Sequence, residues 1–380
     1  MKPATLEYLK QKFAEYYESA TISVPPALIQ REWGFALFSS DENMRMRRHM
    51  AFTSKDEVEN YLRAMVPRHV YYSTAYYTFP AGPTMQEKGW TGADLIFDLD
   101  ADHIVHGDYD KMLERVRIEA LKLIDMLTDE LGFSKQDLSI VFSGGRGYHI
   151  HIRDLAVREW GRAERREMVD YVCGIGIEPD IMLSAGDGTS AGWRRRYRDA
   201  VLEELRFLKD CGKEDGVKAL ASLTGISSEG AGTFYEKIPA LVTELQNKDA
   251  DLSAQYRNER AFKVLLSEAN GRLTERIRER AALTDEPVTT DTKRLIRMPG
   301  SLHGGSGFRV VPVSARELET FDPLTDAVVF GESPVTVDAQ FDLKMPILGN
   351  DYTLSKGTNT VPEALAIFLC ARGIAEIGGR

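Results

Sequence analysis

Two aspartates stand one residue apart at the end of a segment that reads as a buried strand. In ADLIFDLDAD, residues 93–102, the apolar residues predict a strand, and Asp98 and Asp100 share one of its faces because side chains alternate along a strand. Their α-carbons are then about 6.6–6.8 Å apart, so the carboxyl groups can converge on cations about 3.5–4 Å apart. Without a cation the two charges repel each other, so this spacing indicates a metal site.

A glycine-rich turn between two predicted strands forms the second group of candidates. In IVFSGGRGYHIHIRD, residues 140–154, the glycines permit positive φ angles and a close approach of a ligand to the backbone. The turn amides and nearby side chains can donate hydrogen bonds to phosphate oxygens. The candidates are Ser143, Gly144, Arg146 and His149. No GK[ST] follows, so this is not a Walker loop, and a plain hairpin turn is the alternative.

A Pro-Gly turn carries the third group. The segment RLIRMPGSLHG, residues 294–304, follows two aspartates, Asp285 and Asp291, and spacing alone does not choose between them as a third carboxylate. The cationic candidates around the turn are Arg294, Arg297 and His303. Surface arginines and turn-capping aspartates are the ordinary alternatives. All three groups fall at strand ends or connecting turns, where sites are commonly built, and together they suit a metal-bound triphosphate.

The composition is that of a globular protein without membrane spans. The 380 residues are 43% hydrophobic and 28% charged, and no apolar run approaches the ~18 residues of a transmembrane helix. The first 17 residues read as a folded helix and not as a signal peptide. Cys173, Cys211 and Cys370 are isolated, which argues against a disulfide framework and favours the reducing cytoplasm.

The formal net charge of -10 argues mildly against nucleic-acid binding, because phosphate backbones are normally held by excess Lys and Arg. Three local cationic runs weaken that objection: MRMRRH at 44–49, REWGRAERR at 158–166 and WRRRYR at 193–198. Each can form a basic strip, although a solvated helix face is the more common interpretation of any single run.

The order of apolar patterns predicts an α/β core that is interrupted by helices. Short β-branched or aromatic runs alternate with helical stretches up to residue 192, residues 196–284 read as almost wholly helical, and strand patterns return at 293–313. The segment 362–377 is predicted to be a last helix, with Pro362 in its first turn. We therefore expect a discontinuous core, residues 1–192 and 285–380, and an inserted helical subdomain, residues 193–284.

The three motifs together resemble those of the catalytic small subunit of archaeal and eukaryotic-type DNA primases. ADLIFDLDAD is similar to the metal-binding motif of that family, SGGRGYHIHI to its nucleotide-binding motif and RLIRMPGSLHG to its third motif. REWGF at 31–35, MRRHMAF at 46–52 and FLCARGIAE near the end also look like family features. The resemblance covers nearly the whole chain and implies an α+β core with a mixed or antiparallel sheet and a helical insertion.

The resemblance also implies roles for individual residues. The implied metal-binding carboxylates are Asp98, Asp100 and Asp285, so the resemblance favours Asp285 where spacing left Asp291 open. The implied nucleotide contacts are Ser143, Gly144, Arg146 and His149, with Arg297 and His303 on the phosphates. Glu32, Arg48 and Arg294 are implied as supporting members of the site.

The implied activity is the synthesis of short primers on single-stranded DNA from nucleoside triphosphates, by two-metal nucleotidyl transfer in DNA replication. This is a DNA-directed RNA polymerase activity, to which DNA polymerase activity is a possible addition. Mg²⁺ or Mn²⁺ is the implied cofactor and the primase large subunit the implied partner in a heterodimer. The alternatives are a stand-alone repair-type primase-polymerase, a metal-dependent nuclease and a noncatalytic nucleic-acid-binding subunit. A nuclease has less need of residues that bind a triphosphate. A noncatalytic subunit would leave the mutual repulsion of the carboxylates unexplained.

Two positions depart from the family pattern. Relatives often carry a Cys/His zinc site after the Asp-x-Asp strand, whereas ADHIVHGDYDKMLE offers His103 and His106 and no cysteine, which argues against a four-ligand structural zinc. Gly145 stands where relatives frequently have a second basic residue. One phosphate contact of the family is therefore not expected here.

Overall fold

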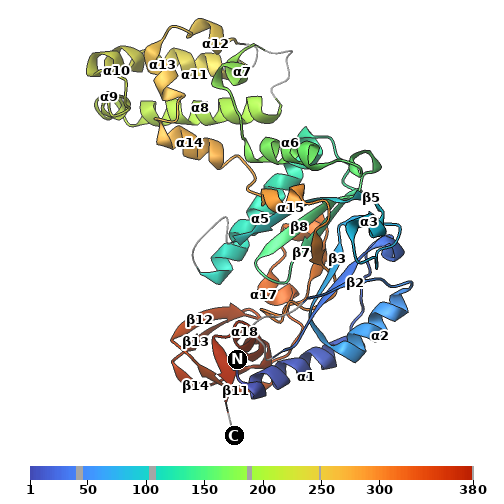
Figure 1. Ribbon diagram of the computed structural model, residues 1–380. Helices are drawn as coiled ribbons and strands as arrows, with labels where there is room; N and C mark the ends of the chain where they lie inside the picture. The colour runs from blue at the N-terminus through green and yellow to red at the C-terminus, as the bar shows by residue number, and fades with distance from the viewer. Residues whose placement is uncertain (40–45, 102–107, 186–190, 248–249, 379–380) are drawn as a thin grey trace. The chain divides into compact units, whose positions relative to one another are not determined.

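The computed structural model describes residues 1–39, 46–101, 108–185, 191–247 and 250–378 (Figure 1). The chain divides into two compact units. Unit 1 comprises Met1–Ile124, Phe133–Glu167 and Leu283–Arg380, and unit 2 comprises Asp125–Gly132 and Met168–Ala282. Unit 2 thus includes residues that the sequence analysis assigned to the core, and the limits 193 and 284 of an inserted subdomain stay a prediction. The mixture of helices with antiparallel sheets confirms the expected α+β class.

The first sheet of unit 1 is antiparallel, with the strand order β2-β1-β3-β9. Its strands are β1 (Trp33–Leu37), β2 (Met46–Met50), β3 (Pro67–Ser73) and β9 (Leu295–Arg297). Helices α1 (Pro3–Ser19) and α2 (Lys55–Met65) pack on one face, where Phe13 and Leu62 meet Val70 and Tyr72 of β3. Because side chains alternate, His69 and Tyr71 are on the opposite face.

The second sheet of unit 1 is also antiparallel and has the order β10-β7-β8-β6. Its strands are β6 (Leu95–Asp100), β7 (Leu138–Phe142), β8 (Gly147–Ile152) and β10 (Val311–Val313). Asp98 pairs with His149 and Asp100 with Gly147, so these four residues share one face. Tyr148, on the other face, packs against the rings of Phe142 and Phe321. The predicted alternation along these two strands is confirmed.

The end of the chain differs from the prediction of one helix over 362–377. Helix α18 covers only Glu363–Ala371, and Ala375–Ile377 forms strand β15. Gly373 has a φ of 75°, which ends the helix after Arg372, and the apolar residues that follow then pair with β11. Pro362 precedes the helix as its N-cap. The described helix is also buried on every side, which its uniformly apolar sequence explains.

Shorter elements complete unit 1. The remaining sheets are β14-β11-β15 and the hairpins β12-β13 and β4-β5. Their strands are β4 (Ala75–Tyr77), β5 (Trp90–Ala93), β11 (Pro334–Ala339), β12 (Leu343–Ile347), β13 (Asn350–Leu354) and β14 (Gly357–Pro362). The other described α-helices with residues in this unit are α3 (Met85–Lys88), α5 (Tyr109–Asp125), α6 (Arg162–Cys173), α15 (Glu286–Thr290), α16 (Ala315–Leu318) and α17 (Pro323–Asp326).

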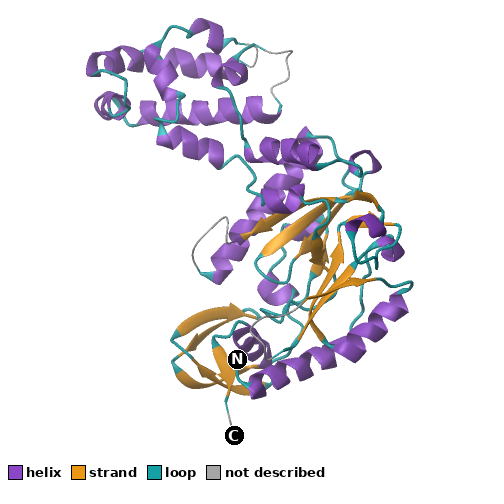
Figure 2. Cartoon of the chain, viewed as in Figure 1, coloured by secondary structure: helices purple, strands orange, loops and turns teal. Residues whose placement is uncertain are grey.

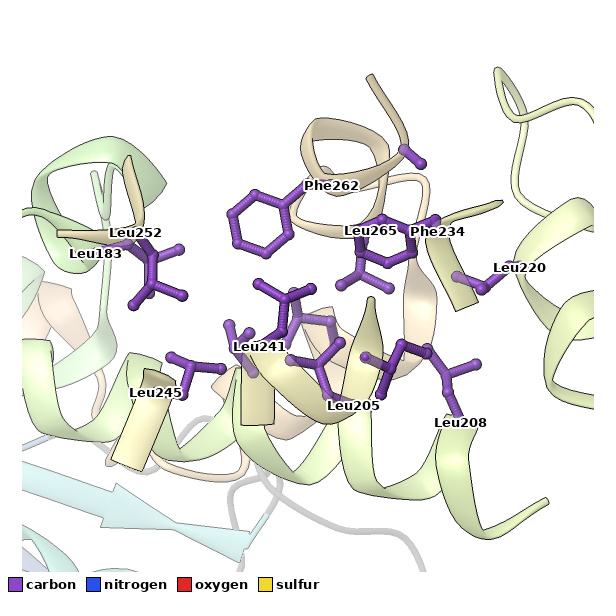
Figure 3. Packing of buried hydrophobic residues seen from close by; sticks show 14 of the residues in the cluster. Leu183, Leu205, Leu208, Leu220, Phe234, Leu241, Leu245, Leu252, Phe262 and Leu265 are labelled. Carbon is purple, nitrogen blue, oxygen red and sulfur yellow. The ribbon is translucent and has the colours of Figure 1, made fainter. Parts of the chain in front are cut away.

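The described part of unit 2 consists of helices and loops (Figure 2). Its helices include α7 (Pro179–Leu183), α8 (Gly192–Asp210), α9 (Lys213–Ala221), α10 (Ser228–Tyr235), α11 (Ile238–Gln246), α12 (Leu252–Gln255), α13 (Arg260–Leu265) and α14 (Gly271–Arg278). Leu205, Leu241 and Phe262 lie in its own buried core (Figure 3). The predicted helical character of 196–284 is confirmed. Over the ranges given above, no helix has the length and apolar character needed to cross a membrane.

Arginines of the cationic run at 193–198 form ion pairs and hydrogen bonds within unit 2. Arg196 forms an ion pair with Glu130 at 2.6 Å, and Arg195 lies 3.6 Å from the same carboxylate. Arg198 donates hydrogen bonds to the carbonyl oxygens of Asn247 and Ala250. These contacts favour a structural role for this run over a free basic strip.

Candidate active site

A cavity of about 580 Å³ in unit 1 brings the three sequence motifs together. Both sheets contribute to its walls, the first through β3 and β9 and the second through β6 and β8. The candidate residues that line it are Asp98, Asp100, Ser143, Arg146, His149, Arg294, Arg297 and His303. With Arg372, which also lines it, four arginines and two carboxylates share one opening, which suits a ligand that carries both phosphate groups and cations.

The two aspartates occupy the end of β6, where the strand reaches the cavity. Both side chains are half-buried, while Phe97 and Leu99 between them are fully buried on the opposite face. Pairing with β8 places the Nε2 atom of His149 3.4 Å from Oδ1 of Asp98. The metal motif and the nucleotide motif are thus neighbours on one sheet.

The glycine-rich turn is braced by Ser143. Its hydroxyl oxygen accepts hydrogen bonds from the amides of Gly145 and Gly147, each at 3.3 Å, so its own proton is available to a ligand. Gly147 must be glycine, because a Cβ atom would lie 2.2 Å from the carbonyl oxygen of Leu99. The hydroxyl of Tyr109 donates to the carbonyl of Gly145 at 2.7 Å and fixes the turn from helix α5.

The Pro-Gly turn closes against the glycine-rich turn. Gly144 has a φ of 75°, and a Cβ atom there would lie 2.7 Å from Cβ of His303. At Gly145 a Cβ atom would lie 3.2 Å from Nε2 of His303, so a side chain there would pack tightly against this ring. Ser306 donates a hydrogen bond to the carbonyl oxygen of Gly144 and locks the two turns together. The guanidinium of Arg297 lies over the ring of Tyr71, 5.1 Å from its centroid.

The histidines of the cavity are neutral. Desolvation, followed by repulsion from His151 and Arg297, lowers the pKa of His149 well below its usual value. Desolvation and the charge of Arg297 likewise hold the pKa of His303 well below the usual range. Each ring therefore has one N–H to donate and one lone pair. The positive charge of the cavity comes from its arginines.

Asp285 approaches β6 through its backbone and is not among the residues that line the cavity. Its amide donates to the carbonyl oxygen of Asp98 at 2.9 Å, and the hydroxyl of Thr284 donates to the same oxygen at 3.0 Å. Asp291 instead accepts a hydrogen bond from the amide of Lys293 at 2.9 Å, which is a turn contact. Of the two candidates, Asp285 is thus the one attached to the strand of the aspartate pair.

Glu32 and Arg48 lie outside the residues that line the cavity. Glu32 is fully buried and pairs with Lys88 at 2.6 Å and with Arg48 at 3.1 Å. Burial alone would raise the pKa of Glu32, but the hydrogen bonds from Lys88 and Arg48 lower it overall. The amide of His49, which has a φ of 61° in β2, also donates to this carboxylate. These contacts hold the bulged edge strand in place.

The donor set at the end of β6 fits a divalent cation. Asp98 and Asp100 present hard oxygen atoms to an open cavity, and Mg²⁺ is commonly held by one or two carboxylates together with substrate phosphates. Within the described ranges, no three His, Cys, Asp or Glu side chains gather closely enough to hold a metal by themselves. Such a site would thus need oxygen atoms from the substrate or from water. His103 and His106 lie outside the described residues.

Among the residues of the cavity that were not identified from the sequence as site residues are two with polar side chains, Tyr71 and Arg372. Tyr71 lines it beneath Arg297, and the sequence indicated only that it belongs to an aromatic strand. Arg372 lines it from the end of α18, with its guanidinium 4.8 Å from the ring centroid of Tyr109 and 5.3 Å from that of Phe368. Arg372 was not predicted as a site residue, because the sequence predicted a longer final helix with this residue inside it.

Comparisons with known proteins identify a family and close relatives. A family model described as DNA primase small subunit matches residues 97–315. The chain is 53% identical over 378 residues to the DNA primase small subunit PriS of Methanoregula boonei, covering 99% of this chain and 100% of that protein. It is 52% identical over 377 residues to the protein of the same name from Methanosphaerula palustris, covering 99% of both chains. The match to the Methanocorpusculum labreanum protein is 53% over 384 residues and covers both chains completely.

Proposed function

The chain belongs to the DNA primase small subunit family, and we propose that the cavity around Asp98 and Asp100 is its catalytic centre. It is the catalytic subunit of an archaeal-type DNA primase, a nucleotidyltransferase that makes primers on a DNA template during replication. The observation that carries the site assignment is the meeting of an aspartate pair and four arginines in one cavity.

We infer that the arginines and neutral donors hold the triphosphate of the incoming nucleotide. Arg146, Arg294 and Arg297 supply charge, and planar guanidinium groups suit bidentate contacts with phosphate. Ser143 and the two neutral histidines add single hydrogen bonds, and we propose that the backbone of Gly144 adds a further contact. The supporting residues Glu32 and Arg48 act indirectly, by fixing the edge of the first sheet.

The aspartate pair is proposed to hold the divalent cations next to the site of bond formation, with Asp285 as the third carboxylate. The bound cations would lower the pKa of the attacking 3′-hydroxyl and offset the charge that develops as pyrophosphate leaves. The residues of the chain position the α-phosphate in line with that hydroxyl, and the rigid turns around Ser143 and His303 keep the donors in place. We propose Mg²⁺ or Mn²⁺ as the cation, because the proposed side-chain ligands are carboxylates.

The remaining partners are also proposals. Single-stranded DNA is the proposed template and nucleoside triphosphates are the proposed substrates. A heterodimer with the primase large subunit is proposed from the small-subunit names of the relatives. The cytoplasm is the proposed compartment, in keeping with three cysteines that form no disulfide bond in the described structure.

The first prediction tests the catalytic centre. The purified chain is incubated with single-stranded DNA, labelled ATP or dATP, and Mg²⁺ or Mn²⁺, and the products are resolved by length. Asp98→Asn and Asp100→Asn should each lower oligomer synthesis by about 100-fold or more, because a hard anionic ligand is lost at constant volume. Asp351→Asn, an exposed position on β13, is the matched control and should keep full activity. Template shortening would support a nuclease, and activity above a few per cent in both variants would remove this assignment.

A further inference from the structure

His69 lies behind the phosphate-binding residues and is not a residue that lines the cavity. It belongs to β3, pairs with Ala36 of β1 and is 7% exposed. It faces the same side of the first sheet as Tyr71, because the two positions are separated by one residue. Its ring therefore packs against the back of the Pro-Gly turn and not against the helices on the other face.

One nitrogen of His69 accepts two hydrogen bonds from the third motif. Nη1 of Arg297 lies 2.7 Å from Nδ1 of His69, and the amide of Gly304 donates to the same atom at 3.3 Å. A guanidinium and an amide are both donors, so Nδ1 must carry a lone pair and the proton must be on Nε2. The two contacts define the tautomer of the ring.

The imidazole remains an acceptor at neutral pH. Desolvation, with repulsion from Arg297 and Arg68, lowers the pKa of His69 to about 3. The groups that face it are consistent with this, since Arg68, Arg297 and the neutral His303 surround the ring. A protonated ring would lose both hydrogen bonds and place two cations side by side.

These contacts connect His69 to both ends of the Pro-Gly turn. Arg297 is fixed between the His69 nitrogen and the face of Tyr71. Gly304 directly follows His303, whose ring meets that of His69 edge to face at 5.3 Å. Nε of Arg68 donates to the carbonyl of Gly304 at 2.9 Å, so neighbouring residues of β3 hold both the amide and the carbonyl of this glycine.

We propose that His69 is a positioning residue for the nucleotide, whose bare Nδ1 orients the guanidinium of Arg297 and the backbone after His303 toward the triphosphate. The proposal rests on the proposed function of Arg297 and His303 as phosphate contacts. It assigns to His69 no contact with the substrate. A role in packing alone would be filled equally well by any side chain of similar size.

The second prediction compares His69→Leu with His69→Asn in primer synthesis. Leucine fills space without an acceptor, so the KM for the nucleotide should rise about 10-fold while kcat changes by less than about threefold. The side-chain oxygen of asparagine can replace Nδ1, so His69→Asn should stay within about threefold of the wild-type KM. Equal losses in the two variants, or a fall in kcat at unchanged KM, would show that the acceptor is not what matters.

A double-mutant cycle separates positioning from the underlying function. In an Arg297→Met background, His69→Leu should raise the KM by no more than about threefold, because the main group that it orients is already absent. Full additivity of the two effects overturns the positioning role. If Arg297→Met alone leaves the KM unchanged, the phosphate assignment of Arg297 fails instead.

A further test uses the wild-type chain, so its main result does not depend on whether a variant folds. Nitrogen NMR of the histidine rings should show His69 with a bare Nδ1 and a protonated Nε2 near pH 7. Arg297→Met should shift the Nδ1 resonance of His69, because the charged donor is removed. A proton on Nδ1 in the wild-type chain would overturn the proposal.

Discussion

The hydroxyl of Ser143 supports the glycine-rich turn, and the residue also lines the cavity. Its oxygen accepts from two amides of the turn, which leaves only its proton for a phosphate oxygen. Substitution of Ser143 by alanine removes both roles at once. Measuring the nucleotide affinity and the free energy of unfolding of the same variant distinguishes them, because the cavity is a small part of the buried structure.

The third prediction concerns the choice between Asp285 and Asp291. Asp285→Asn should lower primer extension, and extra Mn²⁺ should restore it in part by mass action on a weakened site. Asp291→Asn should stay near wild type, because its observed contact is one hydrogen bond from the amide of Lys293, which asparagine can also accept. Primer extension is measured against metal concentration for both variants. The reverse pattern would place the third ligand six residues further along the chain.

Several site residues could be predicted because their chemistry is local. Asp98 and Asp100 follow from strand alternation, and the structure keeps them on one face. His69 and Arg372 could not be found in this way, because their roles come from contacts with residues far away in the sequence. The spacing of Asp285 and Asp291 in the sequence also did not indicate which of them is the third carboxylate. Only the pairing of the Asp285 amide with Asp98 distinguishes them in space.

At the scale of elements, strand β6 is anchored just before its start by Asp94. This carboxylate is 2% exposed and lies 3.1 Å from Nη2 of Arg31, 2.5 Å from the hydroxyl of Tyr76 and 3.4 Å from His151. Burial alone would raise the pKa of Asp94, but the adjacent His151 and the charge of Arg31 hold it below its usual value. The strand that ends at the aspartate pair thus begins at a buried ion network.

The fourth prediction follows from this network. Asp94→Asn should lower the free energy of unfolding by about 3–5 kcal/mol near pH 7, because Arg31 is left buried without its counter-ion. Since the pKa of Asp94 is lower in the folded chain than in the unfolded chain, its stabilisation is complete above about pH 4 and is lost as the pH falls further. Urea unfolding at pH 7 and at lower pH should show the gap between variant and wild type narrowing. A gap independent of pH would contradict this account.

Elements were predictable where a repeating pattern determined them. Strands β6 and β8 show clear alternation, and the helices after residue 196 show the spacing of apolar residues that their core requires. The prediction of one helix over 362–377 was wrong, because an apolar run of this kind fits either a helix or a strand. Its division at Gly373 depends on pairing of Ala375–Ile377 with β11, which is a long-range contact.

At the scale of the whole molecule, unit 2 has a hydrophobic core of its own, seen in Figure 3. The fifth prediction is that Leu241→Ala lowers the stability of this unit by about 2–5 kcal/mol through loss of buried contacts. Hydrogen exchange should show faster exchange of the amides of α8 and α11, while those of β6 and β8 keep their protection. Leu202→Ala, at a partly buried position on α8, is the control and should have a smaller effect. Equal loss of protection in both units would show that they unfold together.

The pairing of β9 with β3 and of β10 with β7 has a consequence during synthesis on the ribosome. Strand β3 ends at Ser73, and its partner begins at Leu295, so the edge of β3 is open while about 220 residues are added, for on the order of 10–45 s. Open strand edges invite pairing with other chains. The residues of unit 2 emerge within this interval and can complete their core first. A nascent chain released after residue 282 and before residue 294 would therefore contain all residues of the helical unit, while the first sheet would be unfinished and the cavity would lack its third motif.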